Sequence, residues 1–350
     1  MADAPLLRID DLRVHFRTDA GTVRAVDGVS YEVRAGETLA VVGESGCGKS
    51  MTALALLRLV PPPGHIVSGS IVFRGENLVS ATEERLRELR GNELAMVFQE
   101  PMTSLNPVFT IGNQIGEVLA LHLGLDDAEC RTETLRLLAL VGIPAPEQRI
   151  DEYPHRLSGG MRQRVMIAMA LACNPELLIA DEPTTALDVT VQAQILELLA
   201  DLQERLGMGV LLITHDLGVV AETARRVVVM YAGLVVEQAS AAALFARPRH
   251  PYTAGLFRSL PAIGGPEGAL RPIEGRVPDA LNFPPGCRFH PRCPHAMPRC
   301  REEEPPLVDR AADGDEPHLS ACFFVDEHPE VDLLADPEPL ADPGPKEAAS

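Results

Sequence analysis

The segment that decides the fold reads Gly43-Glu44-Ser45-Gly46-Cys47-Gly48-Lys49-Ser50 and lies between an apolar stretch, residues 38–42, and a predicted helix over residues 50–60. We call residues 43–50 the phosphate loop. Its pattern, GxxxxGK[ST], uses glycines to turn backbone N–H groups toward phosphate oxygens at the start of a helix. Lys49 is then expected to reach the β- and γ-phosphates of a nucleotide, Ser50 to bind Mg²⁺, and Met51 to complete the contact segment. The flanking strand and helix favour this interpretation over a glycine-rich turn that matches by chance.

Two acids close a second apolar stretch. Asp181 and Glu182 follow residues 177–180, Leu-Leu-Ile-Ala. At a strand end beside a phosphate loop, an aspartate can hold Mg²⁺ directly or through water. The adjacent Glu182 is then expected to act as general base toward the attacking water. Taken alone, such a pair is more often a solvated strand end, but its place downstream of the phosphate loop favours the catalytic interpretation.

A third anion-binding candidate lies between these two segments. Ser158, Gly159 and Gly160 precede a predicted helix over residues 160–173 and offer a hydroxyl and N–H groups at its positive end. A plain N-cap would look similar. One chain does not need two phosphate sites, unless the second serves the nucleotide of a neighbouring subunit.

The order of predicted elements indicates the fold class. The first hundred residues are rich in alternating strands, and later segments alternate strand with helix, as in residues 177–180, 191–206 and 210–214. This order predicts an α/β fold with a parallel sheet covered on both faces. Residues 101–157, between the strand-rich first hundred residues and these later segments, are helical in pattern.

Composition limits the functions open to the chain. Its 350 residues carry 31 Lys+Arg against 50 Asp+Glu, a net charge of −19, which argues against a broad nucleic-acid footprint. Lys49 and Lys346 are the only lysines. No signal-peptide pattern opens the sequence, and no apolar run reaches the ~18 residues of a membrane span. The length is typical of about two or three domains.

At this point the sequence resembles a family. LSGGM (157–161), after GESGCGKS and before LLIADEP, is similar to the ATPase subunits of ATP-binding-cassette (ABC) proteins. The resemblance covers about residues 5–325. It implies a P-loop NTPase fold of the ABC type, with an antiparallel β subdomain and a helical subdomain, and Mg²⁺-ATP as reactant.

The resemblance also assigns roles to single residues. Gln99 would contact Mg²⁺ and couple its site to the membrane partner, and His215 would contact the γ-phosphate. Asp188, in the loop 186–188, would communicate across a dimer, and Phe16 would stack on adenine. Cys47 stands where serine or threonine is also common; it leaves the backbone cradle intact and adds a possible oxidation site.

Longer segments narrow the resemblance. QEPMTSLNP (99–107), the stretch around LSGGM, and HPYTAGLFRSLP (250–261) are similar to the ATPases of oligopeptide and dipeptide importers. This implies a peripheral protein on the cytoplasmic face of the inner membrane. It would pair head-to-tail with a second, related ATPase or a copy of itself, and serve two permease subunits and an extracytoplasmic peptide-binding protein. Alternatives are an importer of another small substrate such as a nickel chelate, a soluble nucleic-acid-associated ABC ATPase, and a regulatory iron–sulfur protein that retains a cassette.

Four cysteines form a second constellation, Cys287, Cys293, Cys300 and Cys322. Zinc sites usually show CxxC pairs, which this spacing lacks, whereas four thiolates in a loop-rich segment can hold an iron–sulfur cluster. Zinc, free thiols and disulfides remain open on the spacing alone. Similar cysteines in the C-terminal region of peptide-importer ATPases are associated with a [4Fe-4S] cluster, and the resemblance implies one here.

These observations predict three regions. Residues 5–246 would form the nucleotide-binding domain, with a helical subdomain over about 101–165. Residues 247–325 would form a small cysteine-rich extension. Residues 326–350, with eight acids, five prolines and one lysine, would form a disordered acidic tail.

Overall fold

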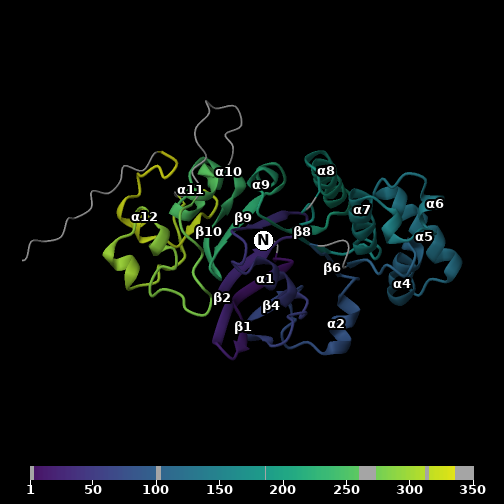
Figure 1. Ribbon diagram of the computed structural model, residues 1–350, viewed down its shortest axis with the longest axis horizontal. Helices are drawn as coiled ribbons and strands as arrows, with labels where there is room; N and C mark the ends of the chain where they lie inside the picture. The colour runs from purple at the N-terminus through teal and green to yellow at the C-terminus, as the bar shows by residue number, and fades with distance from the viewer. Residues whose placement is uncertain (1–3, 100–103, 186, 260–272, 312–314, 336–350) are drawn as a thin grey trace, which may run out of the picture.

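A computed structural model describes residues 4–99, 104–185, 187–259, 273–311 and 315–335. The chain is elongated, with the helices α4, α5 and α6 at one end, the C-terminal helices α10, α11 and α12 at the other, and two sheets between them (Figure 1). No helix of the described part is long and apolar enough to cross a membrane.

The larger sheet carries the phosphate loop. Within the described residues it has eight strands in the order β11-β12-β10-β9-β3-β8-β7-β6. Its parallel centre consists of β9, β3, β8, β7 and β6, and β10 and β12 extend it in antiparallel fashion. The strands are β3 (Thr38–Val42), β6 (Leu94–Val97), β7 (Leu177–Asp181), β8 (Gly209–Thr214), β9 (Arg226–Tyr231), β10 (Leu234–Ser240), β11 (Val308–Asp309) and β12 (Leu319–Ser320). Strands β7 and β8 are buried along their whole length, as their unbroken apolar sequence requires.

The smaller sheet is antiparallel throughout. Its described strands follow the order β2-β1-β4-β5, namely β2 (Gly21–Val33), β1 (Leu7–Thr18), β4 (Gly64–Phe73) and β5 (Glu76–Asn77). It packs over α1 (Lys49–Leu56), the helix that follows the phosphate loop, and shares one apolar cluster with β3 and α1. The predicted antiparallel β subdomain is therefore present.

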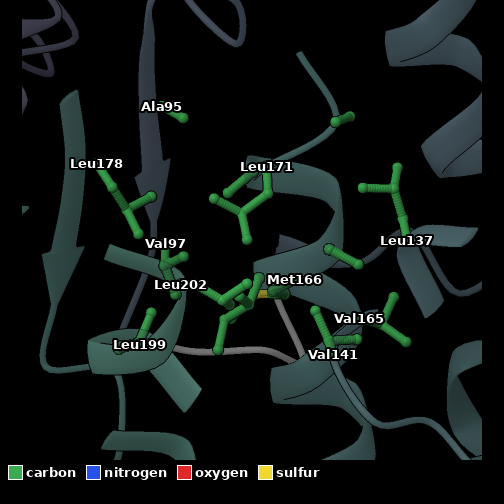
Figure 2. Packing of buried hydrophobic residues seen from close by; sticks show 14 of the residues in the cluster. Ala95, Val97, Leu137, Val141, Val165, Met166, Leu171, Leu178, Leu199 and Leu202 are labelled. Carbon is green, nitrogen blue, oxygen red and sulfur yellow. The ribbon is translucent and has the colours of Figure 1, made fainter. Parts of the chain in front are cut away.

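The helical subdomain lies beyond the β6 edge of the larger sheet. It comprises α4 (Ile111–Leu123), α5 (Asp127–Leu140), α6 (Pro146–Arg149), η1 (Pro154–Arg156) and the start of α7 (Gly159–Ala170). Its expected first residues, 101–103, lie outside the described part. Leu137 of α5, Val165 and Met166 of α7, and Leu199 and Leu202 of α8 (Val189–Leu206) converge on one core (Figure 2). This shared core joins the helical subdomain to the sheet.

The remaining helices flank the sheets. They are α2 (Glu83–Leu89), α9 (Leu217–Thr223), α10 (Ala241–Ala246), α11 (Pro251–Arg258), the short η2 (His290–Arg292) and η3 (Pro298–Arg301), and α12 (Phe323–Glu327). Helices α10 to α12 belong to the C-terminal end, where the described residues 273–311 and 315–335 fold back onto β9 and β10.

The expected disorder from Asp326 onward does not hold for residues 326–335. Leu333 is buried in a cluster with Ala254, Cys322 and Phe324. Arg247 and Arg249 donate hydrogen bonds to the carbonyl oxygen of Pro329 at 2.9 and 2.8 Å. Three apolar residues, Val331, Leu333 and Leu334, interrupt the acidic composition and supply this anchor. The rest of the predicted tail, residues 336–350, lies outside the described residues.

Candidate nucleotide site

The phosphate loop leaves β3 and enters α1 in a conformation that glycine permits. Gly43, Gly46 and Gly48 have φ of +152°, +81° and +105°. A Cβ at Gly43 would lie 2.2 Å from the carbonyl oxygen of Met230, and one at Gly48 would lie 2.4 Å from that of Ala25. These two positions therefore require glycine for packing as well as for φ.

Cys47 is fully buried beneath this loop. Burial raises the pKa of its thiol, although Lys49 acts in the opposite direction. Because a buried, protonated thiol reacts slowly, the structure contradicts the expectation that Cys47 adds an oxidation site.

Lys49 points back over the loop and is 5% exposed. Its Nζ donates to the carbonyl oxygens of Gly43 at 2.7 Å and Glu44 at 3.2 Å, neither of which carries a charge. The Ser50 hydroxyl, one residue on, donates to Asp181 Oδ1 at 3.0 Å. Burial raises the pKa of Asp181, and the Ser50 hydrogen bond lowers it. A buried ammonium beside a hydroxyl–carboxylate pair suits a Mg²⁺-bound triphosphate. The contacts of these three residues with phosphate and Mg²⁺ stay predictions.

Glu182, at the end of β7, contacts the other two predicted catalytic residues, Gln99 and His215. Its Oε2 accepts a hydrogen bond from Gln99 Nε2 at 3.0 Å, and its Oε1 lies 3.3 Å from His215 Nδ1. The backbone of Glu182, directly after β7, has φ +45°, a left-handed value that is strained for a residue other than glycine. Strand ends β6, β7 and β8 thus bring three residues together that are up to 116 positions apart, from Gln99 to His215.

Thr185 also belongs to this group, and the sequence interpretation missed it. Its hydroxyl donates to Glu182 Oε2 at 2.9 Å. The only signal was the pair of threonines directly after Asp181-Glu182-Pro183. Two hydrogen bonds to one carboxylate oxygen orient Glu182 while its other oxygen faces His215.

The predicted second anion-binding element starts α7. Ser158 is the N-cap of this helix and accepts a hydrogen bond from the Met161 N–H at 3.3 Å. Ser158 and Gly159 are nevertheless exposed. Gly160 packs against α8, where a Cβ would lie 2.7 Å from Val191 Cγ1. The segment is therefore a cap whose outer side is accessible to a partner.

Three further predicted residues lie apart from the Glu182 group. Asp188 is exposed and caps α8 by accepting from the Val191 N–H at 2.9 Å; Ala186, in the same predicted loop, lies outside the described residues. Phe16 pairs with Gly64 across β1 and β4 and is partly buried against the core of the smaller sheet. Met51, on α1, packs partly against that same core. Their assigned contacts with nucleotide stay predictions.

The phosphate loop, the Ser50–Asp181 pair and the Glu182 group define the class of protein as a nucleotide-hydrolysing P-loop ATPase with an ABC-type helical subdomain. Comparison with protein families agrees. The family model described as "ABC transporter" matches residues 26–185, and "Oligopeptide/dipeptide transporter, C-terminal region" matches residues 236–300.

Curated relatives align over nearly the whole chain. The "Oligopeptide transport ATP-binding protein AppD" of Bacillus subtilis is 55% identical over 92% of this chain and 97% of its own length. The "Dipeptide transport ATP-binding protein DppD" of Escherichia coli is 52% identical over 91% and 96%. The "Probable peptide ABC transporter ATP-binding protein y4tR" of Sinorhizobium fredii is 53% identical over 92% and 96%. The chain belongs to the oligopeptide/dipeptide transport family of ABC transporter ATP-binding proteins.

Solved structures support the fold. The ATP-binding cassette MJ0796, as a dimer after hydrolysis with ADP and phosphate bound, superposes with a TM-score of 0.60 at 26% identity, covering 67% of this chain and 98% of that chain. CbiO1 of Clostridium perfringens gives 0.59 at 29% identity, covering 70% and 92%. The predicted ABC-type P-loop fold is confirmed.

The four cysteines of the C-terminal segment come together around one small pocket, lined by Cys287, Cys293, Cys300 and Cys322. The Cys287 N–H donates to the carbonyl oxygen of Cys300 at 2.9 Å. Burial raises the pKa of Cys287, Cys293 and Cys322, that of Cys322 to about 12. Among the described residues, no group of three or more His, Cys, Asp or Glu side chains has an arrangement that could hold a metal ion.

Nearby histidines are engaged elsewhere. His295 stacks on Phe324, with ring centroids 4.4 Å apart, and His318 Nε2 lies 2.7 Å from Glu237 Oε1. In the described part of the chain, nothing therefore supports a zinc site in which these histidines would be ligands.

Proposed function

We propose that this chain pairs head-to-tail with a second, related ATPase or with a copy of itself, so that each ATP lies between the phosphate loop of one subunit and residues 158–160 of the other. The exposed Ser158 and Gly159 support this arrangement. Val189, at the start of the helix α8 against which Gly160 packs, is an apolar side chain 84% exposed, as expected of a surface that a partner covers. One matching cassette was also solved as a dimer.

The observation that best supports ATP hydrolysis is that Gln99, Glu182 and His215 lie together, next to the Ser50–Asp181 pair. Mg²⁺, bound with ATP, would supply charge neutralisation on the phosphates. Ser50, Asp181 and Gln99 would hold it, and Lys49 would bind phosphate oxygens. Glu182 would accept the proton of the attacking water, while His215 contacts the γ-phosphate.

Glu182→Gln tests this assignment. The amide keeps the size of the side chain but cannot take a proton, so we expect steady-state hydrolysis to fall by about 100-fold or more. ATP binding should persist, and the variant should form an ATP-dependent dimer visible by size-exclusion chromatography with light scattering. Glu197→Gln, an exposed acid on α8, is the matched control and should behave as wild type. Hydrolysis near the wild-type rate in Glu182→Gln would show that another group is the base.

We propose further that the subunit acts on the cytoplasmic face of the membrane, with two permease subunits and an extracytoplasmic binding protein, in the uptake of dipeptides or oligopeptides. The names of the relatives AppD and DppD, an oligopeptide and a dipeptide transport ATP-binding protein, support peptides as the substrate class. Import of a nickel chelate by a closely similar ATPase is the alternative within the class. The net charge of −19 disfavours the nucleic-acid alternative, and measurable ATP turnover would exclude a purely regulatory iron–sulfur role.

We also propose that Cys287, Cys293, Cys300 and Cys322 hold a [4Fe-4S] cluster. Support comes from the four cysteines that line one pocket and from the burial of Cys300 and Cys322, since a buried thiol ionises readily only when a metal stabilises the thiolate. A cubane cluster is larger than one ion, so its cysteines stand farther apart than the ligands of a single zinc. When bound, the cluster would brace this loop-rich segment.

The cluster proposal is tested by the metal content of protein purified anaerobically. The double variant Cys293→Ser/Cys300→Ser should lose bound iron, because two of four thiolates are gone. Cys173→Ser, which removes a thiol outside the cysteine-rich segment, should retain the bound iron. Wild-type protein that contains zinc and no iron would contradict the proposal.

A further inference from the structure

The C-terminal segment contacts the phosphate loop directly at Glu44, the second residue of the loop. The Glu44 backbone N–H donates to the Tyr252 hydroxyl at 2.8 Å. The Glu44 carboxylate takes two hydrogen bonds from Arg292, Nη1 to Oε2 at 2.7 Å and Nη2 to Oε1 at 3.0 Å. Such a bidentate pair fixes the relative orientation of both groups. Arg292, which is 248 positions from Glu44 in the sequence, thus contacts the phosphate loop directly.

Arg292 is itself held from three sides. Its Nε donates to the carbonyl oxygen of Glu274 at 2.9 Å, and its Nη2 to that of Ile273 at 3.2 Å. Its Nη1 lies 3.3 Å from the Tyr231 hydroxyl, and its side chain is only 4% exposed. A surface ion pair would hold little, but this guanidinium is buried and aimed at one partner.

Aromatic packing fixes the second contact. Tyr252 is fully buried on α11, and its ring centroid lies 4.6 Å from that of Tyr231 and 5.4 Å from that of Phe289. Tyr231 ends β9, the strand next to β3, and Phe289 belongs to the cysteine-rich segment. The Tyr252 hydroxyl therefore has little freedom to move away from Glu44.

We propose that Arg292 and Tyr252 are positioning residues for the phosphate loop, and that ATP affinity depends through them on the fold of the cysteine-rich segment. Glu44 is held at its N–H by Tyr252 and at its carboxylate by Arg292, while its carbonyl oxygen accepts from Lys49 Nζ at 3.2 Å. Displacing Glu44 therefore displaces an anchor of the phosphate-binding lysine. Arg292 closes η2, between Cys287 and Cys293, so the order of that segment determines where the guanidinium stands.

The inference rests on the ATP site of the proposed function, and it predicts a specific kinetic pattern. A preorganised loop lowers the cost of binding ATP, whereas Glu182 and His215 do not contact Arg292 in the described structure. Loss of the Arg292–Glu44 pair should therefore raise the Kd and KM for ATP and leave kcat at saturating ATP close to wild type. A merely structural role would lower the melting temperature without this split.

Arg292→Gln in the full-length chain tests the inference, with equilibrium binding of a fluorescent ATP analogue as the probe. We expect the Kd to rise by about tenfold, as for the loss of a charge-assisted pair. Glu44→Gln should give a similar rise, and the double variant no more than either alone, because both remove the same interaction. Tyr252→Phe keeps the ring packing and removes one hydrogen bond, so the Kd should rise in the same direction but by less. This second variant keeps the inference testable if Arg292→Gln does not fold.

Arg299→Gln is the matched control. Arg299 directly precedes Cys300 as Arg292 directly precedes Cys293, but it is 54% exposed and pairs with Glu303 at 2.9 Å. Its Kd should equal that of wild type. A Kd within twofold of wild type in both Arg292→Gln and Tyr252→Phe, or an equal rise in Arg299→Gln, would overturn the inference. If the wild-type chain itself does not bind ATP, the proposed function fails, and the inference, which rests on it, fails with it.

Coupling between two sites is reciprocal. Bound ATP should therefore slow amide hydrogen exchange in residues 287–300 of the wild-type chain. In Arg292→Gln, at ATP concentrations that give equal occupancy, this protection should be lost. Equal protection in both proteins would contradict transmission through Arg292.

Discussion

Lys49 shows how much one residue can reveal in a chain whose bases are otherwise almost all arginine. Only Lys346 shares its side chain, and Lys346 lies outside the described residues. Lys49 is buried against the carbonyl oxygens of Gly43 and Glu44, in a space that fits a compact ammonium. Arginine would supply the same charge in a broader, planar form.

Lys49→Arg should therefore lower ATP affinity or turnover by about tenfold or more, although the charge is retained. Lys346→Arg makes the same chemical change elsewhere and should leave both quantities unchanged. Nucleotide binding and steady-state hydrolysis measure the two effects. Wild-type activity in Lys49→Arg would mean that the ammonium does not contact phosphate.

At the same scale, sequence patterns predicted the residues that meet at the site but not all their partners. Lys49 and Ser50 belong to a recognisable motif at the start of α1, and Asp181, Glu182 and His215 lie in motifs at strand ends. The contacts of Glu44 with Tyr252 and Arg292 had no such signal, because they depend on how the C-terminal segment folds back across the sheet. No local pattern encodes a contact between residues so far apart in the chain.

Among the elements, α1 illustrates why helix boundaries were less certain than helix existence. The sequence predicted a helix over 50–60 ended by three prolines, whereas α1 ends at Leu56. Arg58 adopts φ +50°, and the N–H groups of Arg58 and Leu59 donate to the carbonyl oxygens of Ala55 and Leu54. This is a Schellman-type ending. It usually carries glycine, so an arginine there gave no signal in the sequence.

The junction of α7 with α8 gives a test of element packing. Gly160→Ala would put a Cβ 2.7 Å from Val191 Cγ1, and the β-branched Val191 has little rotamer freedom in a helix. We expect a loss of about 1–3 kcal/mol in the free energy of unfolding, measured by urea denaturation. Gly159→Ala is the matched control, since its Cβ would meet Leu187 Cδ2 at an ordinary 3.5 Å. Equal stability of the two variants would show that α7 and α8 are not closely packed there.

For the whole molecule, the sequence predicted the order of regions better than their limits. The nucleotide-binding core and the cysteine-rich segment appear in the expected order, but packing of the C-terminal part continues past Asp326 to Leu333. Acidic, proline-rich composition concealed three anchoring apolar residues. The C-terminal region is also more than an appendage, because Arg292 and Tyr252 connect it to the phosphate loop.

The most direct test of the central claim is ATP-driven uptake of a labelled dipeptide by proteoliposomes. These would contain this chain with its partner ATPase, both permeases and the binding protein. We predict uptake that requires Mg²⁺-ATP, falls to background when this chain carries Glu182→Gln, and is not competed by a nickel chelate. Uptake of the chelate without uptake of dipeptides or oligopeptides, or peptide uptake at the wild-type rate with Glu182→Gln, would contradict the account.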